Sequence, residues 1–174
     1  MHGPAQFVTA DATTRVYDIV GSPIGGLALI GDGTVLTGLY METDHARVLA
    51  DPELTRAPGA FPEAADQLDA YFSGERTTFD LPLAPRGTEF QRAVWSALTE
   101  IPYGQTTTYA QLALDIDRPT AIRAVGAANG RNPISLIIPC HRVIGTDGSL
   151  TGYAGGLPRK RTLLDLESGT HMLT

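Results

Sequence analysis

The sequence has 174 residues, of which 43% are hydrophobic, and a formal net charge of −6. This composition is typical of a globular protein that can form a core, in one domain or two small ones. No stretch approaches the roughly 20 apolar residues of a membrane-spanning helix, and residues 1–14 lack the pattern of a signal peptide. The only cysteine, Cys140, excludes a disulfide within the chain. With no export signal, it points to a reducing environment, so we expect a cytoplasmic protein.

The charge differs between the two halves of the chain. Residues 1–87 carry 5 Lys and Arg against 12 Asp and Glu, whereas residues 88–174 carry 8 against 7. The segment from Arg118 to Arg142 holds four arginines and no acidic residue. The total charge argues against a nucleic-acid partner, but this segment could contact phosphate groups. Four arginines over such a span can equally be ordinary surface residues.

The first half has the pattern of a small sheet. Short apolar segments at residues 16–20, 27–30 and 35–40 are separated by turn signals, of which Gly31-Asp32-Gly33 is typical of a hairpin. We therefore predict three antiparallel strands.

A helix is predicted to follow these strands. Residues 42–60 are polar with two prolines and are predicted to form a loop, and the apolar spacing over residues 61–72 predicts a helix. We therefore expect a domain over residues 15–86, preceded by a flexible tail at residues 1–14.

The second half has helix signals. Thr88 and Gln91 form the pattern of a capping box, as do Thr108 and Gln111. A third helix is predicted over residues 120–130. Two short helices across a three-residue turn follow the helix-turn-helix plan, although many helical hairpins bind nothing.

An apolar strand is predicted to end just before Cys140, and a last helix is predicted over residues 158–168. These elements define a second domain over residues 87–174. The fold class predicted for the whole chain is therefore α+β.

Cys140 stands in the run Ile138-Pro139-Cys140-His141-Arg142. An isolated cysteine is more often a small buried hydrophobic residue than a reactive one. Here a histidine and an arginine follow directly, and such neighbours favour the nucleophilic thiolate. We therefore predict that Cys140 reacts faster than a free thiol near neutral pH. His141 could take its proton through one water molecule.

Other polar groups could complete a site around the cysteine. Glu167 could orient the histidine, or it could be a solvated carboxylate at a helix end. Tyr109 could belong to the core or present its hydroxyl group. Asn132-Pro133 is either a simple turn or a hinge whose amide ties two segments together. The segment Tyr153-Ala154-Gly155-Gly156 looks like a flexible loop whose backbone N–H groups could line a pocket.

The predicted third helix carries small residues on one stripe, Ala121, Ala124 and Ala128. Such a stripe lets a backbone approach another helix, which is the common case, or a nucleic-acid groove. The helix has few of the long polar side chains that read the major groove. A shallow fit in the minor groove, with Arg123 inserted into the base stack, remains an alternative.

The sequence predicts neither a metal site nor a cofactor. The four histidines lack ligand spacing, and no phosphate-binding glycine loop or dinucleotide fingerprint is present.

The motifs together resemble one family. The run from Ile138 to Val143 is similar to the active-site signature of the O6-alkylguanine-DNA alkyltransferases, also called methylated-DNA–protein-cysteine methyltransferases. Further matches at the family's spacing are Tyr109, Arg123-Ala124-Val125-Gly126, Asn132-Pro133, Tyr153, Gly155-Gly156, Lys160 and Glu167. The resemblance implies a ribonuclease H-like N-terminal domain joined to a mainly helical C-terminal domain that contains a helix-turn-helix.

The resemblance also implies roles for single residues. Cys140 would accept the alkyl group, His141 would remove its proton through water, and Glu167 would orient His141. Tyr109 would help to rotate the target nucleotide and would protonate the departing guanine, and Arg123 would fill the gap in the duplex. DNA contacts are implied for Tyr109, Arg118, Ala121, Arg123, Ala124, Gly126 and Thr146. The substrate pocket is implied to include Asn132, Tyr153, Ala154 and Gly155.

The implied function is direct repair of O6-alkylguanine, and of O4-alkylthymine, in double-stranded DNA. The alkyl group lies in the base stack, so the nucleotide must be flipped out from the minor-groove side. Because a thioether is not hydrolysed under mild conditions, each molecule would act once. We expect a nucleoid-associated monomer that can cluster on DNA.

Two alternatives stay open at this point. One is a binding-only damage sensor, and the other is a thiol hydrolase with Cys140, His141 and Glu167 as its triad. The repair hypothesis requires the sulfur of Cys140 to be ionised and reachable.

Overall fold

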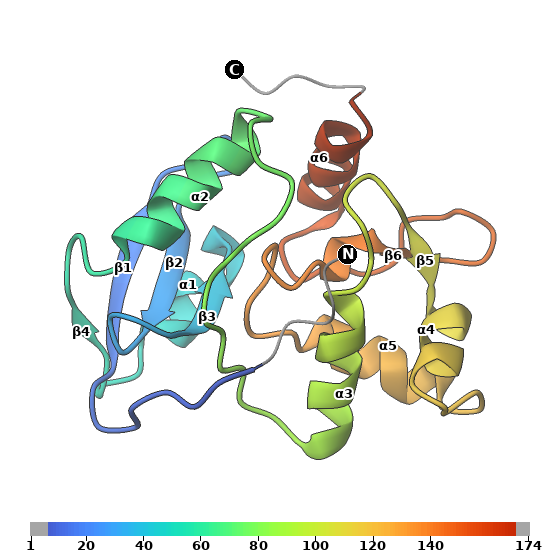
Figure 1. The fold of residues 1–174 in the computed structure, drawn as a ribbon, viewed down its shortest axis with the longest axis horizontal. Helices are drawn as coiled ribbons and strands as arrows, with labels where there is room; N and C mark the ends of the chain where they lie inside the picture. The colour runs from blue at the N-terminus through green and yellow to red at the C-terminus, as the bar shows by residue number, and fades with distance from the viewer. Residues whose placement is uncertain (1–6, 170–174) are drawn as a thin grey trace.

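The computed structural model describes residues 7–169. Figure 1 shows two parts side by side, a sheet with its helices and a group of helices. The first part consists of β1 (Val16–Val20), β2 (Leu27–Gly31), β3 (Leu36–Tyr40), α1 (Glu42–Val48), β4 (Thr55–Arg56) and α2 (Pro62–Phe72). The second consists of α3 (Glu89–Leu98), β5 (Thr107–Thr108), α4 (Tyr109–Asp115), α5 (Ile122–Gly130), a 3-10 helix (Cys140–Arg142), β6 (Val143–Ile144) and α6 (Leu157–Ser168). The predicted α+β class is confirmed.

The sheet has the strand order β3-β2-β1-β4. β2 pairs antiparallel with both β1 and β3, as the turn signals predict, and all five of its residues are buried. β4 lies parallel to β1, with Thr55 opposite Val16. The central strand therefore supplies much of the buried apolar surface of the first part.

The prediction of a loop over residues 42–60 is wrong, because this segment contains α1 and β4. α1 buries none of its residues and has no side-chain cap at its N-terminus, and β4 is two exposed residues long. Neither element therefore produces an apolar periodicity. β4 forms because its backbone pairs with β1, where Thr55 N–H donates to the Arg15 carbonyl.

Two of the predicted helix starts differ in their capping. At α3, Thr88 Oγ1 accepts a hydrogen bond from Gln91 N–H, and the Gln91 side chain accepts one from Thr88 N–H, so the capping box is complete. At α4, Thr108 accepts from Gln111 N–H in the same way. The Gln111 side chain, however, donates to Asp115, so only half of the second capping box forms.

α4 and α5 form the predicted helix-turn-helix, with α5 beginning at Ile122 rather than at residue 120. The turn between them includes Asp117 in the left-handed region, with φ of 59°. Aspartate tolerates this conformation better than most residues.

The prediction of a strand before Cys140 is wrong. Ile134, Ser135 and Ile138 take part only in isolated bridges, and Cys140 lies in the 3-10 helix. Leu136 has φ of 72°, a conformation that no extended strand contains. The chain turns there, and Ile137 N–H donates to the Ser135 carbonyl.

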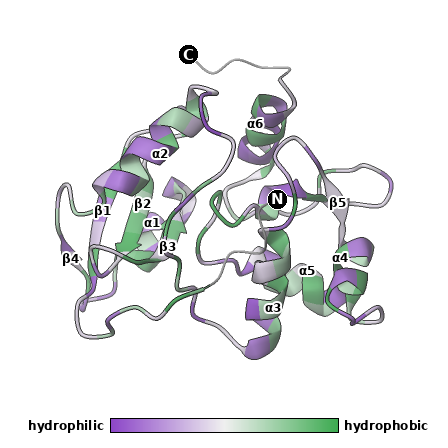
Figure 2. Ribbon diagram, viewed as in Figure 1, coloured by the Kyte–Doolittle hydropathy of each residue, from purple (hydrophilic) through white to green (hydrophobic). Residues whose placement is uncertain are grey.

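One hydrophobic core extends through both parts of the molecule and includes Leu29, Leu39, Tyr71, Trp95 and Leu163. Figure 2 shows hydrophobic residues along β2 and α5 and a mixture of hydrophobic and hydrophilic residues on α2 and α3. Among the described residues, no helix is long and apolar enough to span a membrane.

The predicted tail has contacts where the structure describes it. Residues 1–6 lie outside the described range. Phe7 packs against the core, and Val8 N–H donates to the Leu83 carbonyl. Residues 7 and 8 are therefore attached to the folded part rather than free of it.

Candidate active site

Cys140 begins the 3-10 helix and is 4% exposed. Burial raises the pKa of its thiol, while a hydrogen bond with Asn132 and the charge of Lys160 act in the opposite direction. The net shift of the pKa is upward, which favours the thiol over the predicted thiolate while the sulfur is buried. Burial outweighs these two effects, and the guanidinium of Arg142 is hydrogen-bonded to Glu167 and to the Ile101 carbonyl.

His141 and Glu167 are brought together in the interior. His141 is fully buried, and its Nε2 lies 2.8 Å from Glu167 Oε1. Because an ionised carboxylate only accepts hydrogen bonds, Nε2 carries the proton and Nδ1 has the free lone pair. Nδ1 is buried and has no hydrogen-bond partner among the described residues. This is the tautomer that a base acting at Nδ1 requires.

The ionisation of the pair favours a neutral histidine beside an ionised carboxylate. Burial lowers the pKa of His141, with Glu167 acting in the opposite direction. For Glu167, burial alone would raise the pKa, but hydrogen bonds from His141 and Arg142 outweigh it and lower the pKa to about 2. The interpretation of Glu167 as a solvated helix-end carboxylate is wrong, since its side chain is 1% exposed.

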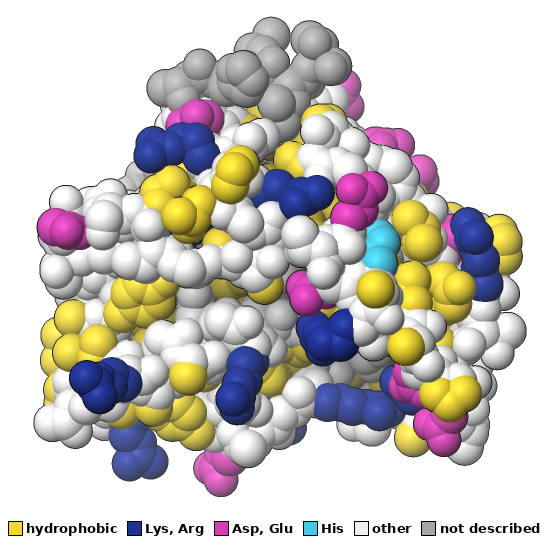
Figure 3. All heavy atoms as spheres, turned by 180° about the vertical axis from the view of Figure 1, so that it is seen from behind, with side chains coloured by type: hydrophobic (Ala, Val, Ile, Leu, Met, Phe, Trp, Pro, Cys, Tyr) yellow, Lys and Arg dark blue, Asp and Glu magenta, His cyan; other side chains and the backbone are white. Residues whose placement is uncertain are grey.

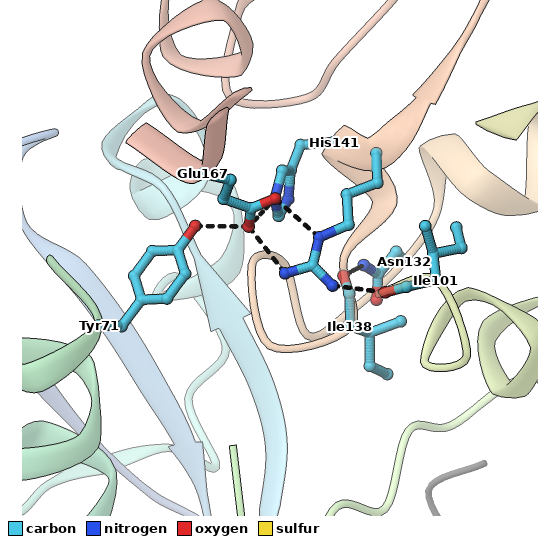
Figure 4. Close-up of polar contacts among 7 residues, drawn as sticks. Tyr71, Ile101, Asn132, Ile138, His141 and Glu167 are labelled. Carbon is cyan, nitrogen blue, oxygen red and sulfur yellow. Dashed lines mark hydrogen bonds and ion pairs between the residues drawn. The ribbon is translucent and has the colours of Figure 1, made fainter. Parts of the chain in front are cut away.

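Two residues that the sequence analysis did not assign also hold Glu167 (Figure 4). Arg142 Nε donates to Oε2 and its Nη2 to Oε1, each at 2.8 Å, and Nη1 donates to the Ile101 carbonyl. The hydroxyl of Tyr71 donates to Oε1, also at 2.8 Å. Arg142 could have been considered from its place in the motif, but nothing in the sequence links Tyr71 to a residue 96 positions away.

Asn132 ties the end of the helix-turn-helix to the cysteine segment. Its Nδ2 donates to the Ile138 carbonyl at 2.7 Å, and its Oδ1 accepts from Ile134 N–H. The side chain is buried. The amide therefore ties the two segments together, as the second interpretation of Asn132-Pro133 expects, and its role as a hinge stays a prediction.

Lys160, which the sequence analysis matched only as a family position, is also fully buried. Its Nζ donates to the Val143 and Thr151 carbonyls. These bonds connect α6 to the segments on both sides of the loop 145–150. Lys160 therefore fixes the path of the chain after Cys140.

Tyr109 stands at the start of α4, half-buried, and contacts both neighbouring segments. Its hydroxyl oxygen accepts a hydrogen bond from Thr151 Oγ1 at 2.8 Å. A Cβ atom placed on Gly126 of α5 would lie 3.7 Å from its ring. The ring thus lies between α5 and the loop that follows the cysteine.

The predicted DNA-contacting residues form no single buried cluster. Arg118, Arg123, Ala124 and Thr146 are exposed, and Ala121 is half-buried. The predicted alanine stripe is divided, because Ala128 is buried in the core. Figure 3 shows basic side chains on the back face as separate groups with acidic and hydrophobic groups between them.

The predicted pocket residues of the loop have different environments. Tyr153 is half-buried and its hydroxyl has no partner among the described residues, whereas Ala154 is exposed. Gly155 is buried, and a Cβ atom there would lie 2.9 Å from Met41 Cγ. This glycine therefore permits a close approach between the loop and the sheet part.

Across the described residues, no group of three or more His, Cys, Asp or Glu side chains could hold a metal ion.

Comparison with known proteins gives matches over both parts of the chain. A family model described as 6-O-methylguanine DNA methyltransferase, DNA binding domain, matches residues 89–169, and its ribonuclease-like domain counterpart matches residues 15–85. The methylated-DNA–protein-cysteine methyltransferase of Mycobacterium tuberculosis is 55% identical over 151 residues, covering 87% of this chain and 91% of the relative. The chain belongs to the methylated-DNA–protein-cysteine methyltransferase family. The resemblance inferred from the cysteine motif is thereby confirmed.

Other members of the methyltransferase family are similar to this chain over most of its length. The Methanosarcina barkeri relative is 54% identical and covers 87% of this chain and 96% of its own length. The crystal structure of Mycobacterium tuberculosis OGT in complex with DNA has a TM-score of 0.84 at 54% identity, over 89% of this chain and 94% of that one. A Mycobacterium tuberculosis O6-methylguanine methyltransferase has a TM-score of 0.85 at 52% identity, over 91% and 95%.

Proposed function

We propose that this protein repairs DNA directly, by irreversible transfer of the alkyl group of O6-alkylguanine to Cys140. The proposal rests on one observation: in this member of the methyltransferase family, Cys140, His141 and Glu167 are all buried, and His141 is hydrogen-bonded to Glu167. The protein is an enzyme of the methylated-DNA–protein-cysteine methyltransferase class, and it binds DNA. We further propose that its substrate is duplex DNA that carries O6-alkylguanine or O4-alkylthymine, and that it acts in the cytoplasm.

The chemical step is a displacement at carbon. The sulfur of Cys140 attacks the alkyl carbon, the bond from that carbon to guanine O6 breaks, and a carbon–sulfur bond forms. His141 Nδ1 takes the thiol proton through a bridging water molecule, and the departing guanine gains a proton from the Tyr109 hydroxyl. Glu167 stabilises the imidazolium that forms. The thioether that forms is not hydrolysed under mild conditions, so each molecule acts once.

For the alkyl group to reach the sulfur of Cys140, both the DNA and the protein have to change conformation. The alkylated base must leave the duplex, which costs a few kcal/mol, and an arginine inserted in its place offsets part of that cost. Arg123 is exposed on α5 and suits this role. Cys140 is 4% exposed, so we expect the loop after it to open when the flipped base enters. Such an opening would break the bond from Thr151 to Tyr109, while the bonds from Lys160 to the Val143 and Thr151 carbonyls hold the two ends of the moving segment.

The proposal is tested with a duplex that contains O6-methylguanine. We expect the intact protein to gain one methyl group, and Cys140→Ala to bind the same duplex without gaining mass. Binding without a mass change in the unaltered protein would favour a damage sensor. Repeated turnover of an ester or amide would favour a thiol hydrolase. In sedimentation, a single species of monomer size both without and with DNA would indicate a monomer. Larger species on DNA would indicate clustered copies.

A further inference from the structure

Glu167 Oε1 accepts hydrogen bonds from three different side chains (Figure 4). His141 Nε2, Arg142 Nη2 and the Tyr71 hydroxyl each lie 2.8 Å from this single oxygen. Two of these donors follow directly after Cys140 in the sequence. The third comes from α2, in the sheet part of the molecule.

Tyr71 is placed there by the packing of α2. Its side chain is fully buried, and its ring contacts the rings of Phe72, Phe79 and Tyr103. Burial first, and the neighbouring Glu167 charge second, raise the pKa of Tyr71 well above its ordinary value. The hydroxyl therefore stays protonated near neutral pH and can donate to Glu167.

We propose that Tyr71 is a positioning residue for the methyl-transfer reaction, through which the N-terminal part sets the basicity of His141. This inference rests on the proposed function, because it concerns the same His141–Glu167 pair. Tyr71 touches neither the sulfur nor the substrate, so it acts through Glu167.

The physical argument is a competition for one oxygen. A hydrogen bond to a carboxylate draws the carboxylate's negative charge toward the donor. The carboxylate then stabilises a neighbouring cation, such as an imidazolium, less strongly. With Tyr71 bound to Oε1, Glu167 holds the His141 imidazolium less strongly. His141 thus stays neutral, with Nδ1 free to act as a base, down to a lower pH. The charged groups that act on this pair are Arg142 and Lys160, whereas the nearby Tyr103 and Tyr153 have raised pKa values and are neutral neighbours of Glu167.

The test replaces Tyr71 with phenylalanine, which keeps the buried ring and removes only the hydroxyl. Two quantities are measured: the pKa of His141 by NMR, and the rate of single-turnover methyl transfer from an O6-methylguanine duplex as a function of pH. We expect the His141 pKa and the acidic limb of the rate profile to move upward together by about 0.5 to 1 unit. Affinity for the duplex should stay the same.

Tyr103→Phe is the matched control. Its ring packs edge-on against Tyr71, 6.1 Å between centroids, and lies 5.8 Å from the guanidinium carbon of Arg142. Its hydroxyl is not one of the donors to Glu167. The control should therefore leave the His141 pKa where it is in the unaltered protein.

A second variant keeps the donor and strengthens it. With 3-fluorotyrosine at position 71 the hydroxyl is more acidic, so the His141 pKa should move downward. Unchanged His141 pKa values in both variants, or an equal shift in Tyr103→Phe, would overturn the inference. An unaltered protein that accepts no methyl group would instead overturn the proposed function, and the NMR measurement would still decide on Tyr71.

Discussion

Glu167 is the residue on which the polar contacts of the site converge. It accepts from an imidazole, a guanidinium and a phenol, and three donors offset the cost of burying its charge. The sequence predicts Glu167 as a candidate because of the family's spacing. It cannot predict the number of donors, because that depends on how α2 and α6 pack.

The low pKa of Glu167 predicts an acid-sensitive contribution to stability. Its folded pKa is about 2 against an ordinary value of 4.5, so the stabilisation is complete above about pH 5 and is lost as the pH falls through 2. The loss is on the order of 3 kcal/mol. Urea unfolding between pH 5 and 2 should show a steeper decline for the unaltered protein than for Glu167→Gln. The exposed Glu100→Gln is the control, and its decline should match that of the unaltered protein.

The raised pKa of Cys140 predicts low reactivity in the resting protein, contrary to the expectation from its neighbours in sequence. Because the buried thiol stays protonated near pH 7, iodoacetamide should modify it more slowly than a free cysteine, by about tenfold or more.

His141→Ala should slow methyl transfer by about a hundredfold or more, since it removes the base. Rapid modification at pH 7, or an unaffected His141→Ala variant, would contradict this description of the site.

At the level of elements, α5 presents one long charged side chain, that of Arg123, on the exposed side that could meet a base stack. Its buried side, with Val125, Ala128 and Asn129, belongs to the core. Arg123 and Ala124 lie on the exposed side. The low profile of the small residues lets the helix backbone come close to the minor groove.

We therefore expect Arg123→Ala to impair repair in duplex DNA selectively. The rate of methyl transfer from a duplex should fall by about tenfold or more, because nothing fills the gap left by the flipped nucleotide. Reaction with the free O6-methylguanine base should change little, since no stack is opened. Equal losses with both substrates would show that Arg123 does not act by insertion.

The elements that the sequence predicts are those with strong local signals. The capping box at Thr88 and the apolar spacing over residues 61–72 have local physical causes, and both helices form. α1 and β4 have no such signal, because one buries nothing and the other exists only through pairing with β1. The segment before Cys140 is apolar like a strand, but the left-handed Leu136 turns it back.

At the level of the whole molecule, the N-terminal part helps to form the site. Leu39 N–H of β3 donates to the Pro133 carbonyl, and Ser135 N–H donates back to the Leu39 carbonyl. The Tyr71–Glu167 bond joins α2 to α6 across 96 positions. Such contacts follow from docking of the two parts, which no local pattern encodes. The motif therefore pointed to Cys140 and His141 as candidates but gave no sign of Tyr71.

The most direct test of the account is the stoichiometry of transfer. The protein is mixed with an excess of duplex containing O6-methylguanine, and intact mass and peptide mapping follow the reaction to its plateau. We predict one methyl group per protein molecule, located on Cys140, and no further removal of lesions after the plateau. An unchanged mass, a methyl group on another residue, or continued turnover would contradict the account.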